Sequence, residues 1–199
     1  MQPRRHGGWL AKLGVTTVAR WWRGLPTTIR FVVRAALLMA AFCAVLYYPY
    51  SDDSLPGRMF SRYLALVARV SGGCVSLFDP HVQIAGTFIT GRHALQIVLD
   101  CAALDALALF AATVLAFPAA VRVKAIGLGA GILIISGFNV LRIVILYVAG
   151  TKSLEVFDFL HEDVMALLIV LVSVGCFAAW ASRARNSSTR LAAHAASPV

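Results

Sequence analysis

Long apolar segments separated by short polar segments dominate the chain. Their lengths and flanking residues predict four helical spans of roughly 20 residues, the length that crosses a bilayer. The predicted spans cover residues 29–50, 95–117, 125–149 and 161–180. Most basic residues lie before the first span, between the second and third spans, or after the fourth. The positive-inside rule therefore places both termini in the cytoplasm.

The segment between the first two spans contains two weaker patterns. Over residues 58–70, arginines recur on one helical face, which predicts an amphipathic helix rather than a further span. The glycine pair 72–73 is expected to interrupt that helix. The next stretch, HVQIAGTFITGRH, has short alternating runs around Gly86 and Gly91, which indicates a small β-hairpin. Both elements are expected outside the membrane.

Three glycines, Gly127, Gly129 and Gly131, lie within the third predicted span. No strand precedes them, so they do not form a nucleotide-binding loop. Small residues in a membrane helix instead indicate close packing against a neighbouring helix.

Composition narrows the class of protein. With 60% hydrophobic and 14% charged residues and a mean hydropathy of +0.80, the chain is too apolar for an ordinary soluble domain. The net charge of +9 requires no nucleic-acid partner, because the basic residues follow the expected topology. The four cysteines lack metal-ligand spacing and the loop histidines His81 and His93 are scattered, so we expect no metal and no cofactor.

These patterns predict an all-α membrane protein, a polytopic helical bundle with about four transmembrane spans, an extracytoplasmic amphipathic helix and a small β-hairpin. We divide it into three segments. Residues 1–28, rich in arginine and tryptophan, form a basic interfacial arm on the cytoplasmic side. Residues 29–181 form the transmembrane catalytic domain, and residues 182–199 a basic, disordered cytoplasmic tail.

A candidate site comes from polar side chains within the predicted spans, since ionisable groups are costly at membrane depth. Counted from the outer ends of their spans, Cys101 and Arg142 both lie about 9 Å below the outer face. His161 opens the fourth span at the same face. The topology thus predicts that a thiol, a guanidinium and an imidazole converge in one outer layer.

These residue types suit acyl transfer on a peptide. Cysteine attacks as the thiolate, whose pKa falls beside a cation, and His161 would take the thiol proton and return it to a leaving amine. Arg142 stays protonated, so it would hold a substrate carbonyl or the developing oxyanion. Asn139, three residues earlier on the same helical face, would orient either partner.

A non-enzymatic interpretation uses the same residues. Arg142 would pair with Asp100, Asp105 or Asp158 in a structural buried charge network of a membrane assembly partner or transporter subunit. Other membrane proteases fit less well. The HExxH motif of metalloproteases lacks its second histidine here, and no GxSG motif is present.

Three stretches, VQIAGTFITGRHALQIVLDCAAL, FNVLRIVIL and FDFLHEDV, occur in an order and at separations that resemble the exosortase/archaeosortase family of membrane cysteine transpeptidases. The family pattern is an extracytoplasmic hairpin, a helix with the cysteine, an arginine in an N-x-x-R-I setting and a histidine opening the last helix. The resemblance implies that Cys101 is the nucleophile, Arg142 a substrate-positioning or transition-state cation, and His161 the general acid/base. Asn139, Asp105 and Asp100 are expected to support them.

The resemblance also implies partners and a location. Substrates would be membrane-anchored secreted proteins with a PEP-CTERM-like sorting signal: a short motif, a transmembrane helix and a basic cluster. Cleavage would take place at the extracytoplasmic face of a prokaryotic inner membrane, with water or a surface polymer as acceptor. The chain differs from the pattern at Ala102 and Ala103, where a small polar residue and glycine are common, and at Asp105. These differences fit either a divergent active enzyme or an inactive relative.

Overall fold

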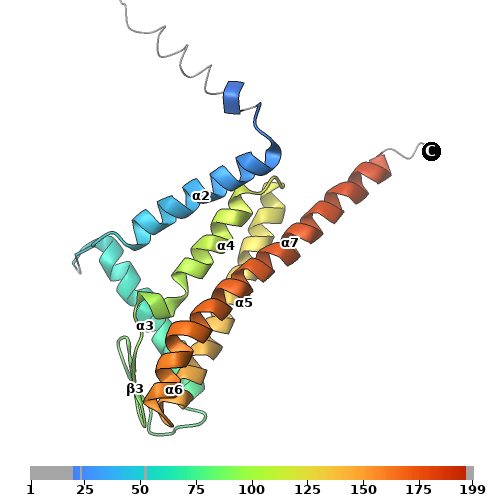
Figure 1. Ribbon diagram of the computed structural model, residues 1–199. Helices are drawn as coiled ribbons and strands as arrows, with labels where there is room; N and C mark the ends of the chain where they lie inside the picture. Colours follow the sequence, from blue (N-terminus) through green and yellow to red (C-terminus); the bar gives the residue numbers. More distant parts are fainter. Residues whose placement is uncertain (1–19, 23, 52, 196–199) are drawn as a thin grey trace, which may run out of the picture.

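The computed structural model describes residues 20–22, 24–51 and 53–195. Helices dominate it (Figure 1). They are α2 (Thr27–Leu46), α3 (Leu55–Val75), α4 (Leu104–Ala116), α5 (Val121–Gly150), α6 (Leu154–Phe159) and α7 (Met165–Ala195). A small antiparallel sheet contains β1 (Gln83–Ala85), β2 (Phe88–Thr90) and β3 (Ala94–Gln96), in that order. The predicted fold class, a polytopic helical bundle with a small β element, is confirmed.

Three helical segments are long and apolar enough to cross a membrane: Thr27–Leu46, Val121–Gly150 and Leu154–Asn186. Helix α4 is apolar but has only 13 residues. The count of about four apolar helices therefore agrees with the prediction, with one of the four too short to cross at full length.

The predicted second span begins later than expected. Residues 95–103 are not α-helical: β3 continues to Gln96, a 3-10 turn follows, and α4 starts at Leu104. Leu95 and Ile97 are buried while their neighbours are exposed, an alternation typical of an extended chain. The prediction of a helix from residue 95 is wrong because this period of two was overlooked in an apolar run.

Helix α3 is longer than predicted. It continues through the glycine pair 72–73 to Val75. Gly72 packs against the side chain of Ile84 of β1, where a Cβ would clash. This glycine therefore allows the helix to approach the sheet and does not end the helix. The hairpin of β1 and β2 is confirmed, with Gly86 in the left-handed conformation at its turn. Strand β3, which pairs with β2, was not predicted.

Close packing at the glycines of α5 is confirmed at two of the three positions. A Cβ at Gly127 would overlap Trp180 of α7, and a Cβ at Gly131 would overlap Phe110 of α4. Gly129 has no neighbour within 4 Å. These two glycines let α4 and α7 approach α5 along the core of the bundle.

The structure also differs from the prediction in the segment between the last two predicted spans, residues 150–160, and in the predicted tail. The acidic segment from Leu154 is helical rather than a loop, because Ser153 caps it by accepting a hydrogen bond from the Val156 N–H. His161 therefore lies inside a continuous helical segment, within a π-helical turn, Leu160–Val164. Helix α7 continues to Ala195, into the segment predicted as a disordered tail. The predicted arm of residues 1–28 lies largely outside the described residues.

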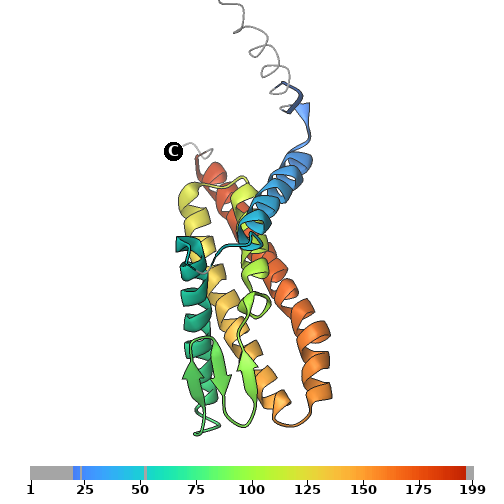
Figure 2. The ribbon, with the colours of Figure 1, turned by 90° about the vertical axis from the view of Figure 1, so that its left-hand side faces the viewer.

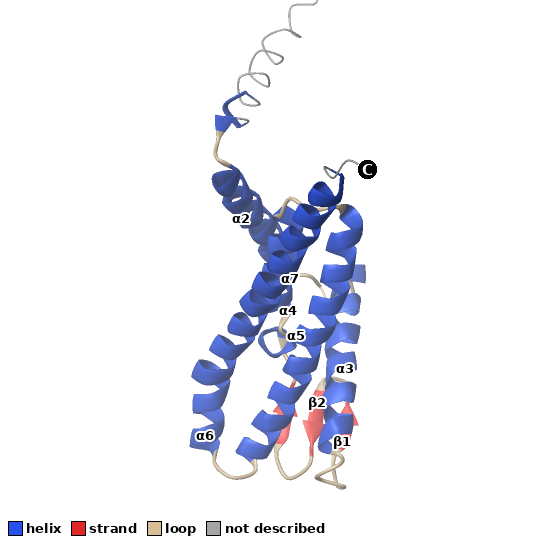
Figure 3. Cartoon of the chain, turned by 90° about the vertical axis from the view of Figure 1, so that its right-hand side faces the viewer, coloured by secondary structure: helices blue, strands red, loops and turns tan. Residues whose placement is uncertain are grey.

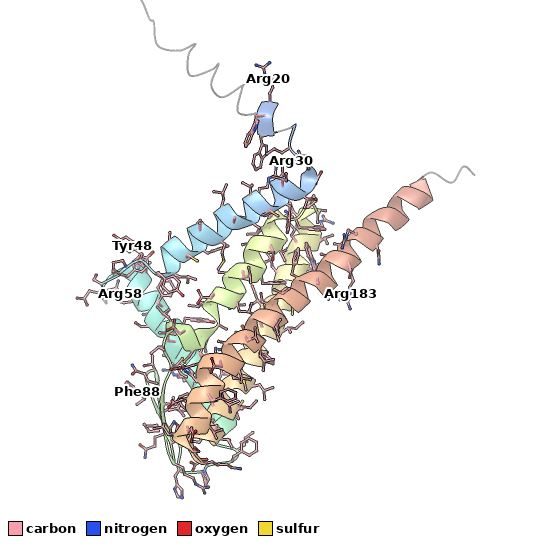
Figure 4. All side chains as sticks on the ribbon, viewed as in Figure 1. Arg20, Arg30, Tyr48, Arg58, Phe88 and Arg183 are labelled. Carbon is pink, nitrogen blue, oxygen red and sulfur yellow. The ribbon has the colours of Figure 1, made fainter. Side chains whose placement is uncertain are left out.

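The start of α2 and the end of α7 lie at one end of the bundle, and the sheet lies at the other (Figures 1 and 2). The labelled cations Arg20, Arg30 and Arg183 lie toward the first end, and Phe88 lies on the sheet (Figure 4). Helix α5 is central, with α3 on one side and α6 and α7 on the other (Figure 3).

Asp79 joins the sheet to α5. Its carboxylate accepts hydrogen bonds from the Tyr147 hydroxyl at 2.7 Å and from the backbone N–H groups of His81 and Arg92. The hydrogen bond from Tyr147 is the main cause that lowers the pKa of Asp79 below its ordinary value. Gly91 is required nearby, because a Cβ there would overlap the Tyr147 hydroxyl.

We expect Asp79→Asn to lower the free energy of unfolding at neutral pH, because it removes a charged acceptor of three hydrogen bonds. Since the pKa of Asp79 is lowered in the folded state, its stabilisation is present at neutral pH. It is lost as the pH falls below the ordinary carboxyl pKa of about 3.9. Thermal unfolding of the wild-type protein and the variant in detergent, at neutral pH and below the ordinary carboxyl pKa, measures this loss of stability. An equal acid-induced loss in Asp79→Asn would contradict the assignment.

Candidate active site

Three consecutive backbone carbonyls in the turn that carries Cys101 accept hydrogen bonds from side chains of α3 and α5. The 3-10 turn, Leu99–Ala102, joins the sheet to α4. Arg142 Nη1 donates to the Asp100 carbonyl at 3.4 Å and Asn139 Nδ2 to the Cys101 carbonyl at 2.9 Å. Tyr63 of α3 donates to the Ala102 carbonyl at 3.2 Å. Distant helices thus satisfy the backbone acceptors that a 3-10 turn leaves free.

Ala103 ends this turn in the left-handed conformation, with φ 55° and ψ 22°. Its Cβ makes that conformation unfavourable by roughly 1–2 kcal/mol. The strain is tolerated because the residues on both sides are held: the turn by the three hydrogen bonds, and α4 by core packing. The sharp change of direction turns Cys101 away from the axis of α4.

Cys101 and His161 are in contact. The Sγ atom lies 3.4 Å from His161 Nε2, although the two residues are 60 positions apart in the sequence. The imidazole stacks on the Phe157 ring, with 5.6 Å between ring centroids and 5° between the planes. The π-helical turn adds a residue to the helical repeat there, a feature often found at functional sites. Phe157 therefore restricts the imidazole to an orientation that faces the thiol.

The Cys101 thiol is 6% exposed and belongs to the apolar core between α3, the sheet and α5. Burial is the main influence and raises the pKa of this thiol. A hydrogen bond from the backbone at Val98 and the charge of Arg142 lower the same pKa less strongly. The sequence predicted that neighbouring cations lower this pKa. In the resting structure burial outweighs them, so the thiol keeps its proton until a base removes it.

Arg142 is buried, at 4% exposure, and its Nε atom has no hydrogen-bond partner among the described residues. Arg142 contacts the backbone carbonyl of Asp100, which is an exposed residue. In the described part of the chain Arg142 forms no ion pair with Asp100 or Asp105. A buried guanidinium without a carboxylate partner retains donors for a substrate oxygen.

Asp105 contacts Tyr47 rather than Arg142. The Tyr47 hydroxyl donates to Asp105 Oδ2 at 2.8 Å, and this hydrogen bond raises the pKa of Tyr47 to about 12. Since Tyr47 directly follows α2, the contact places the start of α4 level with the end of a predicted membrane span. Cys101 precedes Asp105 by four residues, in the turn before α4.

The structure thus brings Cys101 and His161 into contact and joins Arg142 and Asn139 to the same turn. Asp100 takes part through its backbone only, and Asp105 is one turn away. Tyr63 and Phe157 were missed by sequence reasoning. Tyr63 is separated from Ala102 by 39 positions, and no local pattern distinguishes it from other residues of an amphipathic helix.

The arrangement has the parts for nucleophilic acyl transfer: a thiol, a base in contact with it and a free cation donor beside the turn. Within the ranges that the structure describes, no group of three or more His, Cys, Asp or Glu side chains is placed to hold a metal ion.

Comparison with known proteins identifies a family. The sequence model described as Transmembrane exosortase (Exosortase_EpsH) matches residues 10–178, which is most of the chain. No curated protein and no solved structure matches the chain. The match contains the turn with Cys101 as well as Asn139, Arg142 and His161.

The raised pKa of Cys101 predicts slow alkylation of this thiol at neutral pH. The rate with iodoacetamide should rise with a midpoint above the ordinary thiol pKa of about 8.5. The measurement uses a variant in which the other cysteines, Cys43, Cys74 and Cys176, are replaced by alanine. A midpoint near neutrality would instead indicate a preformed thiolate and contradict the prediction.

The strained conformation of Ala103 predicts that Ala103→Gly stabilises the protein by up to about 1 kcal/mol, because glycine has no Cβ penalty at positive φ. The same substitution at Ala111, inside α4, should destabilise by about 1 kcal/mol. Thermal unfolding of the two variants in detergent compares them directly. Destabilisation by both substitutions to the same extent would show that Ala103 is not strained.

Proposed function

Since the chain belongs to the transmembrane exosortase family, we propose that it is a membrane-embedded cysteine protease or transpeptidase acting on C-terminal sorting signals. The contact of 3.4 Å between Cys101 Sγ and His161 Nε2 carries this proposal. A buried thiol without an adjacent base would be inert. The contact supplies the base that activation of this thiol requires.

In the first step His161 Nε2 takes the proton from the Cys101 thiol as sulfur attacks the carbonyl carbon of the scissile peptide bond. The carbonyl becomes a tetrahedral oxyanion. Arg142 supports this charge through guanidinium donors that no carboxylate occupies. Asn139 holds the turn of the nucleophile through the Cys101 carbonyl.

In the second step the carbon–nitrogen bond breaks, and the imidazolium of His161 returns its proton to the leaving amine. The product is a thioester between Cys101 and the N-terminal part of the substrate. Water or an amine or hydroxyl of a surface acceptor then attacks the thioester carbonyl carbon, and His161 again takes the proton of the attacking group. The carbon–sulfur bond breaks, and the imidazolium returns this proton to the Cys101 sulfur. The raised pKa of the thiol fits this order, since proton removal and attack occur together.

The proposed substrates are membrane-anchored secreted proteins that end in a short motif, an apolar helix and a basic cluster. We place the reaction at the extracytoplasmic face of a prokaryotic inner membrane, with both termini of the enzyme in the cytoplasm. The hydrogen bond from Tyr47, directly after α2, to Asp105, four residues after Cys101, supports a site near the membrane surface. The cations toward the opposite end of the bundle (Figure 4) support this orientation.

The non-enzymatic alternative requires Arg142 to neutralise buried aspartates. Arg142 instead bonds a backbone carbonyl, Asp105 bonds Tyr47, and Asp100 is exposed. The contacts therefore favour the enzymatic proposal over a structural charge network.

We expect Cys101→Ala to abolish processing of a tagged reporter with a sorting signal of the proposed form, taken from the same genome. His161→Gln should lower the rate by at least about 100-fold, the usual contribution of a general base. Processing is measured in membranes as loss of the C-terminal tag.

Cys74→Ala is the matched control, since Cys74 is half-buried near the end of α3 and should be dispensable. Membrane insertion and thermal unfolding of each variant are measured in parallel. Unchanged processing by an inserted, folded Cys101→Ala variant would reject Cys101 as the nucleophile.

A further inference from the structure

A groove of about 300 Å³ lies between α3 and α5. Helix α7 lies on the other side of α5 (Figure 3). Its walls are apolar or small. They are formed by Tyr63, Leu66, Val67, Val70, Leu133, Ser136, Gly137, Asn139 and Val140. Leu66 is 55% exposed and Leu133 75% exposed. Gly137 has no atom within 4 Å of an added Cβ, so this helix face is open rather than packed.

Asn139 lines the groove and carries one buried acceptor without a hydrogen-bond partner in the described part of the chain. Asn139 is 2% exposed, and its Oδ1 atom receives no hydrogen bond from the described residues. The orientation of the amide is determined, because the Cys101 carbonyl is only an acceptor and must face Nδ2. A buried acceptor of this kind costs about 1–3 kcal/mol if it stays unpaired. The groove therefore favours an occupant that brings a donor.

The donor limits the chemistry of the occupant. A lipid acyl chain has none, and the backbone N–H groups inside a membrane helix are already paired. The first four N–H groups of a helix have no intrahelical partner. The start of an apolar helix thus provides both features of the groove, apolar surface and a free donor.

The direction of α5 fits such a helix. From Asn139 back to Val121 the helix spans 18 positions, or about 27 Å at 1.5 Å per residue, close to the hydrocarbon thickness of a bilayer of about 30 Å. Leu133 and Gly129 continue the groove face toward the start of α5, and Gly129 also lacks neighbours. A helix that begins at Asn139 would therefore run along α5 across the membrane.

We propose that the groove between α3 and α5 seats the apolar anchor helix of the substrate, and that the first turn of this helix donates a hydrogen bond to Asn139 Oδ1. This proposal rests on the proposed function. Asn139 and Tyr63 line the groove and also hold the carbonyls of Cys101 and Ala102. Seating of the helix is thereby coupled to the position of the nucleophile turn.

Blocking the groove tests the proposal. Gly137→Leu adds a side chain to the groove wall, where an added Cβ has no neighbour within 4 Å, and should raise the apparent KM for the reporter by about tenfold or more. Gly175→Leu is the matched control, because Gly175 of α7 also has no neighbour within 4 Å. It should leave KM unchanged, and both variants should unfold at the wild-type temperature.

Crosslinking separates docking from catalysis. A photo-reactive residue replaces Leu133 in the groove or Leu171 on the exposed face of α7, in the Cys101→Ala background. The probe is the reporter whose C-terminus holds an apolar helix of about 20 residues and an Arg-rich tail. The expected result is a crosslink to the probe helix from position 133 and none from position 171.

The outcomes distinguish the two proposals. Normal processing by Gly137→Leu, or a crosslink from position 133 to lipid only, would overturn the docking proposal and leave the catalytic one intact. A crosslink from position 133 with no processing by the wild-type protein would reject the catalytic proposal and support docking.

Discussion

The structure depends on satisfying the backbone of one short turn. Residues 100–102 lie between the sheet and α4, and each of their carbonyls accepts a hydrogen bond from a side chain of another helix. Unpaired backbone groups within a membrane protein cost several kcal/mol each. Side chains from α3 and α5 supply the three donors. This requirement explains why α3, though not a predicted span, packs along α5 at the level of the turn.

The same turn joins two apolar cores. Cys101 belongs to the core of α3, the sheet and α5, whereas Ala103 belongs to the core of α4, α5 and α7. Packing on both sides holds the thiol against His161, and it has two costs: a raised thiol pKa and a strained Ala103. Strain of this kind persists only where the surroundings over-determine the conformation, often at functional sites. Both costs fall on residues at or next to the proposed nucleophile.

A second network links the sheet to the histidine. Asp79 bonds Tyr147, whose ring lies against His93, and His93 contacts Phe157, on which His161 stacks. The imidazole of His161 is thus oriented by aromatic contacts that connect it, through Tyr147, to Asp79 in the loop before β1. The sheet therefore has a role in the site, since β3 delivers the Cys101 turn and the loop before β1 anchors the residues behind His161.

The motifs that contain Cys101, Arg142 and His161 carried the resemblance to the family. Hydropathy and charge determined, from the sequence alone, a helical membrane bundle and its approximate spans. These features depend on local periodicity and composition, which a single chain displays directly. The tertiary structure decided that residues 95–103 leave the helix, that Asp105 pairs with Tyr47, and that Tyr63 and Phe157 support the site. An apolar run is compatible with either a helix or a strand, and only contacts between distant residues select one. From the sequence, Cys101 was expected near His161 as part of a continuous helix. In the structure, Cys101 contacts His161 from a turn that distant side chains hold in place.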